Sequence, residues 1–266
     1  MNRRVVSVIA VGAVAAGVAL GTSLSASAAA CVTPSPLAHR GGNERYVENS
    51  RNAYRDASNQ TVGFWETDVR FTRDNVPVLM HDETVDRTTD GTGPVAEFTY
   101  AELSELRTDD DQPVPTLRDF INDQVVDAAY AFVELKVNPN ATQWTALEAA
   151  LKSRGGTAPL PAISSFDAAT LDEAKTRLPT YARALVQGVG DVDPATVKLH
   201  ANILIKNKDA ITAARMAKWT AGGLRVYSWT VNDPAEWKRM ASYPGMAGII
   251  TDKPRAFLAW KRSRTC

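Results

Sequence analysis

Residues 64–70 read Phe-Trp-Glu-Thr-Asp-Val-Arg, and residues 76–82 read Val-Pro-Val-Leu-Met-His-Asp. Both runs are rich in the aromatic and β-branched residues that are typical of strands. Glu66 and Asp68 stand two positions apart, so a strand places both carboxylates on the same face. Hard oxygen donors with no cysteine nearby predict a site for one divalent cation, Mg²⁺ or Ca²⁺ rather than Zn²⁺.

Further strand-like runs alternate with helical patterns along the chain. The nine runs lie at residues 36–40, 63–70, 76–80, 130–136, 160–165, 181–186, 201–205, 224–230 and 247–251. This alternation predicts a parallel α/β protein, and the chain length favours a closed (β/α)₈ TIM barrel over an open sheet. Nine candidates for eight barrel strands mean that one lies outside the barrel or is not a strand.

The link at residues 71–75 is too short to hold a crossover helix. Residues 63–82 therefore form either a hairpin or a compact crossover, and the barrel is expected to be distorted near its second and third strands. The spacing from Asp82 to Glu134 leaves only a modest connection, so no large inserted domain is expected to cover this part of the barrel, and the cleft is predicted to be open.

Helix-capping residues stand before several of the predicted helices. Starts are expected at Asn49 or Ser50, Thr99, Thr116, Asp167, Asp193-Pro194 and Asp233-Pro234. A further helix is expected to begin near Asp209 and to end at Gly222-Gly223.

Two of the three histidines end short apolar runs, where a strand meets its loop. His39 is followed by Arg40, and His81 is followed by Asp82. Imidazole titrates near neutral pH, so this pair can deliver and remove protons within one turnover. His200 stands alone in the sequence, and we expect it to be structural.

These segments resemble the signature of the glycerophosphodiester phosphodiesterase family, within the phospholipase C-like phosphodiesterases. The matching motifs are His39-Arg40-Gly41, Glu48-Asn49-Ser50, Glu66-Thr67-Asp68-Val69, His81-Asp82, Thr88-Thr89-Asp90-Gly91, Glu134-Leu135-Lys136, Trp229-Thr230-Val231-Asn232 and Gly248-Ile249-Ile250-Thr251-Asp252-Lys253-Pro254. Ser50 stands where threonine is usual. Ser164-Ser165-Phe166 also resembles a step of the family pattern, with no clear catalytic duty.

The resemblance implies roles for several of these residues. Glu134 would be the third metal ligand, beside Glu66 and Asp68. Arg40 and Lys136 would bind the substrate phosphate. Trp229 either walls the substrate pocket or belongs to the core, and Asp252 is expected to cap the last helix.

Residues 1–30 have the pattern of an export signal: Arg3 and Arg4, an apolar run, then small residues ending at Ala30. Its removal would leave one barrel domain, residues 31–266, in a secreted protein. Lipidation of Cys31 is disfavoured, because Ala28 occupies the position where a lipobox usually has leucine. In an exported protein, the two cysteines, Cys31 and Cys266, are expected to form a disulfide.

The mature chain would carry 28 basic and 30 acidic residues. This balance predicts neither a nucleic-acid partner nor stable association with an anionic membrane, and we expect a monomer. The resemblance implies hydrolysis of small glycerophosphodiesters to glycerol 3-phosphate and an alcohol. The alternatives are a phospholipase C- or D-type enzyme that acts on intact phospholipids, and a barrel that binds phosphate esters without turnover.

Overall fold

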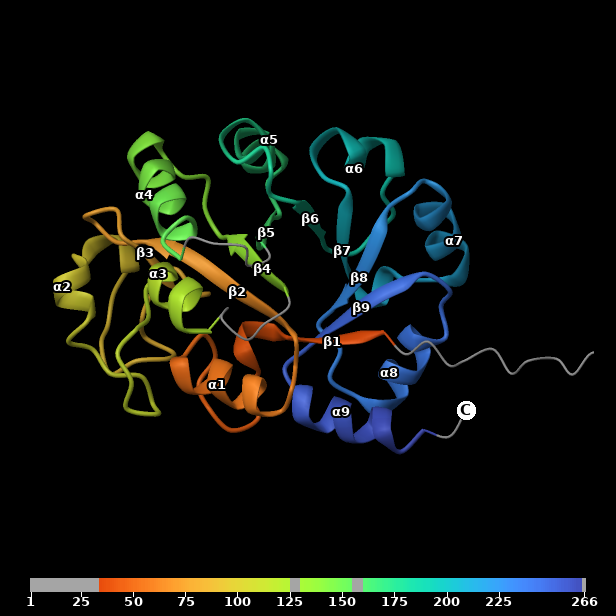
Figure 1. Ribbon diagram of the computed structural model, residues 1–266, viewed down its shortest axis with the longest axis horizontal. Helices are drawn as coiled ribbons and strands as arrows, with labels where there is room; N and C mark the ends of the chain where they lie inside the picture. The colour runs from red at the N-terminus through yellow and green to blue at the C-terminus, as the bar shows by residue number, and fades with distance from the viewer. Residues whose placement is uncertain (1–33, 125–129, 155–159, 265–266) are drawn as a thin grey trace, which may run out of the picture. The chain divides into compact units, whose positions relative to one another are not determined.

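The computed structural model describes residues 34–124, 130–154 and 160–264. Within these ranges one sheet has the strand order β1-β9-β8-β7-β6-β5-β4-β2-β3, and β1 also pairs with β2. Eight parallel strands therefore close into a barrel (Figure 1). The strands are β1 (Ser35–Ala38), β2 (Phe64–Phe71), β3 (Pro77–Leu79), β4 (Tyr130–Leu135), β5 (Ala162–Ser165), β6 (Arg183–Gln187), β7 (Ile203–Asn207), β8 (Arg225–Trp229) and β9 (Met246–Thr251). The predicted TIM barrel is confirmed.

Strand β3 lies outside the closed barrel that the other eight strands form. It pairs antiparallel with β2, with Val69 opposite Leu79. The link is a tight turn in which Thr72 N donates to Val76 O at 3.1 Å, and Asn75 adopts a left-handed backbone with φ +64°. Residues 63–82 thus form a hairpin rather than a crossover.

Helices follow most barrel strands and surround the sheet (Figure 1). They are α1 (Arg51–Asn59), α2 (Tyr100–Leu103), α3 (Leu117–Asp119), α4 (Ala141–Leu151), α5 (Ala168–Arg177), α6 (Pro194–His200), α7 (Ala213–Ala221), α8 (Pro234–Ala241) and α9 (Pro254–Arg262). Short 3₁₀ turns occupy His39–Gly41, Val95–Glu97 and Lys208–Ala210, and a π turn occupies Phe120–Gln124.

Most of the predicted helix caps are confirmed. The side chains that accept from the first helical turn are those of Ser50, Thr99, Thr116, Asp167, Asp193 and Asp233. The helix expected from Asp209 is an exception, because Lys208–Ala210 form a 3₁₀ turn and α7 starts after Thr212, which caps it. This helix ends at Gly222, as predicted.

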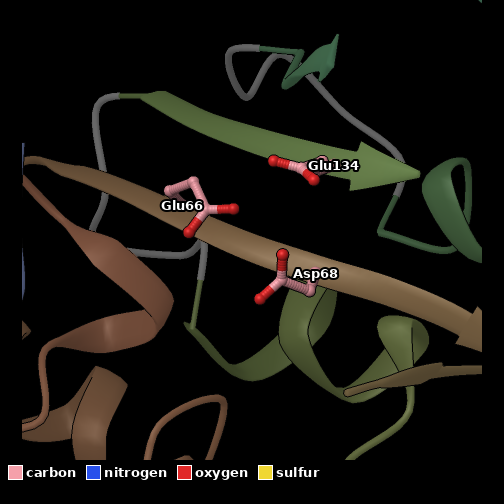
Figure 2. Close-up of side chains that lie close together, drawn as sticks. All are labelled: Glu66, Asp68 and Glu134. Atoms are coloured by element: carbon pink, nitrogen blue, oxygen red, sulfur yellow. The ribbon is translucent and has the colours of Figure 1, made fainter. Parts of the chain in front are cut away.

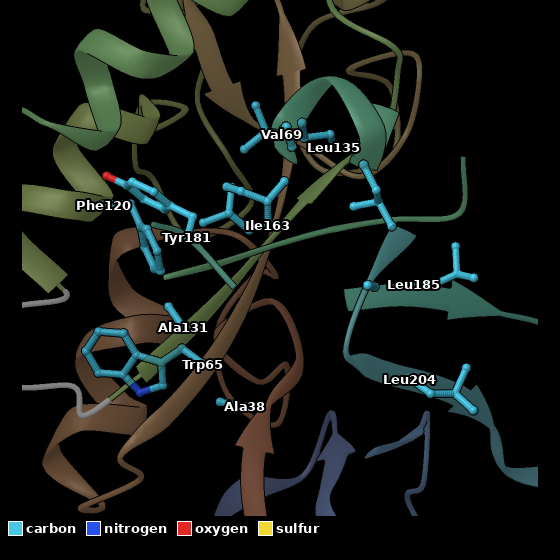
Figure 3. Packing of buried hydrophobic residues seen from close by; sticks show 14 of the residues in the cluster. Ala38, Trp65, Val69, Phe120, Ala131, Leu135, Ile163, Tyr181, Leu185 and Leu204 are labelled. Atoms are coloured by element: carbon cyan, nitrogen blue, oxygen red, sulfur yellow. The ribbon is translucent and has the colours of Figure 1, made fainter. Parts of the chain in front are cut away.

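Apolar side chains fill two layers, because alternate residues of each strand face opposite sides of the sheet. Outward-facing residues such as Trp65, Val69 and Leu204 pack against the helices (Figure 3). The inner layer fills the barrel with Leu37, Phe132, Ala162, Ala184, Val186, Ile203, Ile205, Tyr227 and Ile250. In the described ranges, no helix has both the length and the apolar character needed to cross a bilayer.

Candidate active site at the carboxyl ends of the strands

Three buried carboxylates project towards one another from two neighbouring strands (Figure 2). Glu66 and Asp68 come from β2 and Glu134 comes from β4, with Asp68 directly opposite Glu134 in the strand register. One ligand oxygen from each lies within 4.8 Å of the others. The predicted Glu66 and Asp68 pair does share a face, and the structure brings Glu134 to it.

The three carboxylates of the cluster are buried and repel one another. Burial, followed by repulsion from Asp68 and Glu134, holds the pKa of Glu66 well above its usual value. Burial and the neighbouring Asp68 also raise the pKa of Glu134. Glu66 Oε1 is buried and has no hydrogen-bond partner among the described residues. Oxygen donors in this arrangement fit a hard divalent cation.

Two cations flank the cluster. Arg40 Nε lies 3.1 Å from Asp68 Oδ2, a contact that is an ion pair rather than an aligned hydrogen bond. Lys136 Nζ donates to Glu134 Oε1 at 2.7 Å and lies 3.5 Å from Asp68 Oδ1. Both predicted phosphate-binding residues therefore lie beside the carboxylates.

The backbone of Arg40 also takes part in the site. Arg40 adopts a left-handed conformation with φ +53°, which is uncommon for a side chain of this size. Its N–H donates to Glu66 Oε2 at 3.0 Å. Gly41 follows with φ +87°, and a Cβ there would lie 2.9 Å from Ala53 Cβ, so glycine lets this turn pack on α1.

Each of the two histidines is held by a carboxylate through Nδ1. His39 Nδ1 lies 2.5 Å from Asp252 Oδ1, and its Nε2 lies 3.9 Å from Glu66 Oε2. His81 Nδ1 lies 2.7 Å from Asp82 Oδ1. An ionised carboxylate accepts a hydrogen bond, so in both rings Nδ1 carries the proton and Nε2 is left for proton transfer.

The expected role of Asp252 as a helix cap is wrong. Helix α9 begins after Lys253, and no side chain caps it. Asp252 instead binds His39, and its Oδ2 accepts from Asn232 Nδ2 at 2.5 Å. Burial alone would raise the pKa of Asp252, but the hydrogen bond from His39 and its charge lower it below its usual value.

Glu48 and Asn49, to which sequence reasoning gave no part in the chemistry, organise the site. Asn49 is buried in a left-handed conformation with φ +57°. Its Nδ2 donates to Asp68 Oδ2 at 3.0 Å, while its Oδ1 accepts from Tyr54 Oη at 2.9 Å and from Thr67 Oγ1 at 3.0 Å. Asparagine tolerates a left-handed backbone better than most residues, so an asparagine in this motif was the one feature of the sequence that could have indicated this turn.

Glu48 connects Arg40, beside the carboxylate cluster, with Arg87, which binds Asp82. It accepts from Arg40 Nη1 at 2.8 Å and from Arg87 Nη2 at 2.6 Å. Arg87 Nε donates in turn to Asp82 Oδ2 at 2.6 Å. The chain of ion pairs therefore runs from the Arg40 side to the carboxylate that holds His81.

The remaining sequence candidates fall in three places. Trp229 ends β8 and packs edge-to-face on Phe166, with ring centroids 5.4 Å apart. His200 belongs to α6 and lies 2.8 Å from Asp172, outside the carboxylate cluster. Cys31 and Cys266 lie outside the described residues, so their predicted disulfide stays a prediction.

The TIM barrel, with carboxylates, cations and histidines at the carboxyl ends of its strands, fits a hydrolase that uses acid–base chemistry. Comparisons with known proteins identify the family. Residues 39–256 match the model of the glycerophosphoryl diester phosphodiesterase family. Glycerophosphodiester phosphodiesterase 1 of Homo sapiens is 30% identical over 264 residues, which cover 82% of this chain and 77% of that protein. A glycerophosphodiester phosphodiesterase of Caldanaerobacter subterraneus is 27% identical, over 84% of this chain and 95% of the relative.

Solved structures agree with these matches. A phosphodiesterase from Oleispira antarctica, solved in complex with the product sn-glycerol-3-phosphate, superposes with a TM-score of 0.79 at 24% identity, over 87% of this chain and 98% of that one. This likeness supports the fold. The family match and the curated relatives show that this chain belongs to the glycerophosphodiester phosphodiesterase family, a family of hydrolases.

Proposed function

We propose that this enzyme hydrolyses glycerophosphodiesters to glycerol 3-phosphate and an alcohol, by acid–base catalysis that depends on a divalent cation. The observation that carries the proposal is the pair of histidines His39 and His81, each fixed through Nδ1 by a carboxylate. Binding alone needs no such matched pair, so the arrangement favours turnover. The glycerol 3-phosphate in the Oleispira antarctica structure supports a substrate of this kind.

The cation would be held by Glu66, Asp68 and Glu134. The fit rests on three buried carboxylates with one orphaned oxygen, Glu66 Oε1. The oxygen donors suit Ca²⁺ or Mg²⁺. When bound, the ion would neutralise negative charge that builds on a phosphate oxygen during the reaction.

Arg40 and Lys136 would bind the substrate phosphate. Both are tied to site carboxylates, and burial of each cation is offset by those charges, which hold the pKa of Lys136 above its usual value. They are therefore charged at neutral pH and in place before substrate arrives, so little reorganisation is needed. Trp229 would wall the pocket beside them.

The proton transfers follow from the two imidazoles. We assign His81 as the first base, because burial lowers its pKa and leaves the ring neutral near pH 7. His81 Nε2 would take the proton of the glycerol hydroxyl next to the phosphate, and that oxygen would attack phosphorus. The bond from phosphorus to the alcohol oxygen breaks as His39, which would enter this step protonated on both ring nitrogens, donates its Nε2 proton to that oxygen. Water then hydrolyses the cyclic phosphate. In this second step His39 would take a proton from the water, and His81 would return a proton to the glycerol oxygen.

We further propose that the protein is exported, acts as a monomer and does not bind membranes stably. Residues 1–30 support export through their basic start, apolar run and small residues. Mass determination of the protein from culture supernatant would test removal of this segment. A full-length mass would refute it.

The proposed activity can be tested on glycerophosphocholine in the presence of Ca²⁺ or Mg²⁺. We expect release of glycerol 3-phosphate and choline, loss of activity in excess EDTA and its return on adding the ion. Phosphatidylcholine vesicles and a phosphate-ester binding assay complete the comparison. Faster cleavage of the vesicles would favour a phospholipase, and binding without turnover would favour a non-catalytic barrel.

A further inference from the structure

Strand β2 carries a third polar side chain on the face that holds Glu66 and Asp68. This residue is Arg70, and the period of two along a strand directs its side chain to the same side of the sheet as the two carboxylates. Glu66 and Asp68 are buried (Figure 2), whereas Arg70 is only partly buried. Arg70 therefore lies nearer to solvent, at the carboxyl end of the strand and at the mouth of the barrel.

The guanidinium of Arg70 is anchored beside His81. Its Nε donates to His81 O at 2.9 Å. The β2–β3 hairpin makes this contact possible, because Arg70 pairs with Val78 on the antiparallel strand that leads to His81. The contact holds the guanidinium next to the residue that we assign as the first base, and it uses only one of the N–H donors of the arginine.

The other donors of Arg70, its two Nη groups, have no hydrogen-bond or ion-pair partner in the described part of the chain. The neighbouring cations differ in this respect, because a carboxylate of the site pairs with each of Arg40, Lys136 and Arg87. A partly buried polar group without a partner has lost hydration that a bound ligand can replace. The Nη groups of Arg70 are thus free to donate to an acceptor in the cleft.

The charges around Arg70 favour a neutral acceptor over an anionic one. Burial lowers the pKa of Arg70, and four nearby carboxylates oppose this shift: Glu83, Asp68, Asp82 and Glu134. These carboxylates offset the charge of the guanidinium through space and would repel a further anionic group. A hydroxyl oxygen accepts a hydrogen bond from a guanidinium without adding charge. The glycerol of the proposed substrate offers such an oxygen.

We propose that Arg70 binds the terminal hydroxyl of the substrate's glycerol, the one on the carbon farthest from phosphorus. This inference rests on the proposed function. In the proposed route His81 Nε2 meets the hydroxyl next to the phosphate, so the terminal hydroxymethyl group is the next part of the glycerol and would extend towards the neighbouring Arg70. Arg70 would then select glycerol over a shorter diol. It would also hold the glycerol so that the attacking oxygen faces His81.

The test compares glycerophosphocholine with 2-hydroxyethyl phosphocholine, which keeps the choline and the hydroxyl next to the phosphate but lacks the terminal hydroxymethyl group. We expect kcat/KM of the wild type to be about 10- to 100-fold higher for glycerophosphocholine, the usual gain from a hydrogen bond to a charged group. Arg70→Met keeps an apolar stem without donors and should remove most of this ratio. Arg70→Gln, whose amide is shorter, should do the same and covers the case that the methionine variant does not fold.

Arg73→Met is the matched control. Arg73 lies in the turn of the same hairpin and also donates to a backbone carbonyl, that of Glu97, at 2.8 Å, but it is exposed and pairs with Glu102. This variant should keep the full ratio between the two substrates.

The outcomes separate the two proposals. Absence of turnover of both substrates by the wild type would refute the proposed function. Equal wild-type rates on the two substrates would overturn the assignment of Arg70 alone. An equal loss on both substrates in Arg70→Met would also overturn it, because Arg70 would then only position His81. Glycerophosphoserine adds one arm. If Arg70→Met lowers its cleavage relative to glycerophosphocholine while the first ratio is unchanged, Arg70 binds an anionic leaving group and the inference is overturned.

Discussion

His39 and Asp252, 213 positions apart in the chain, lie with Nδ1 and Oδ1 separated by 2.5 Å. Closure of the barrel brings them together. Ala38 of β1 pairs with Thr251 of β9, and His39 and Asp252 are the residues that directly follow this pair. Asn232 donates to the other oxygen of Asp252. The carboxylate is thus fixed on both sides, and it fixes the orientation and the tautomer of His39.

The first prediction concerns Asp252 as a positioning residue. Asp252→Asn should lower kcat by about 10²-fold or more with little change in KM, because an amide neither enforces the tautomer nor stabilises the protonated ring. Steady-state kinetics and circular dichroism would measure this. Asp233→Asn is the matched control, since Asp233 caps α8 and asparagine caps equally well. An unchanged kcat in Asp252→Asn would assign the contact to stability alone.

The second prediction concerns the pH profile. Hydrogen bonds from Arg87 and from His81 hold the pKa of Asp82 below its usual value, so Asp82 is ionised at neutral pH and its hydrogen bond raises the pKa of His81. In Asp82→Asn the pKa of His81 should therefore fall further. If neutral His81 is the first base, the acid limb of kcat/KM against pH should move to lower pH. A shift of the basic limb instead would make His81 the first acid.

Much of this site could be predicted from short-range patterns. Glu66 and Asp68 share a face because strands have a period of two, and the Glu134 motif ends a strand of the same sheet. The pairing of Asp252 with His39 could not be predicted from such patterns, because it depends on how the last strand closes on the first. The side of the sheet taken by β3 also depends on tertiary packing. Its Val78 joins a small core with Met80, Val85 and Val95 that no local pattern specifies.

The third prediction separates the histidines. His39→Ala and His81→Ala should each lower the rate by about 10²- to 10⁴-fold, the usual cost of losing a proton-transfer group. His200→Ala should keep at least half of the activity, because His200 contacts Asp172 and not the carboxylate cluster. Turnover rates of the three folded variants would check this. A loss in His200→Ala as large as in His39→Ala would contradict the assignment.

The fourth prediction concerns the cation and is measured by thermal unfolding. An ion that binds only the folded state at a hundredfold its Kd adds about 2.7 kcal/mol to the free energy of unfolding. Ca²⁺ or Mg²⁺ should therefore raise the Tm of the wild type, and EDTA should reverse the shift. Glu66→Gln should lose most of this shift. Its Tm without the ion should not fall, because burial and the neighbouring Asp68 and Glu134 already disfavour the ionised form of Glu66.

A control for this measurement is Glu173→Gln, which removes an exposed carboxylate paired with Arg177 on α5. This variant should keep the full ion-dependent shift. An equal shift in Glu66→Gln and Glu173→Gln would place the cation elsewhere.

The last prediction concerns the glycerol hydroxyl next to the phosphate. If it is the attacking oxygen, it reacts at an effective concentration far above that of any external nucleophile, often 10⁵ M or more. Propyl phosphocholine has the same leaving alcohol as glycerophosphocholine but no hydroxyl, so its cleavage should be slower by about 10³-fold or more. Phosphorus NMR of glycerophosphocholine turnover should also detect a transient cyclic phosphate. Comparable rates for the two substrates would mean that water attacks directly, with the same two histidines then activating water and protonating choline.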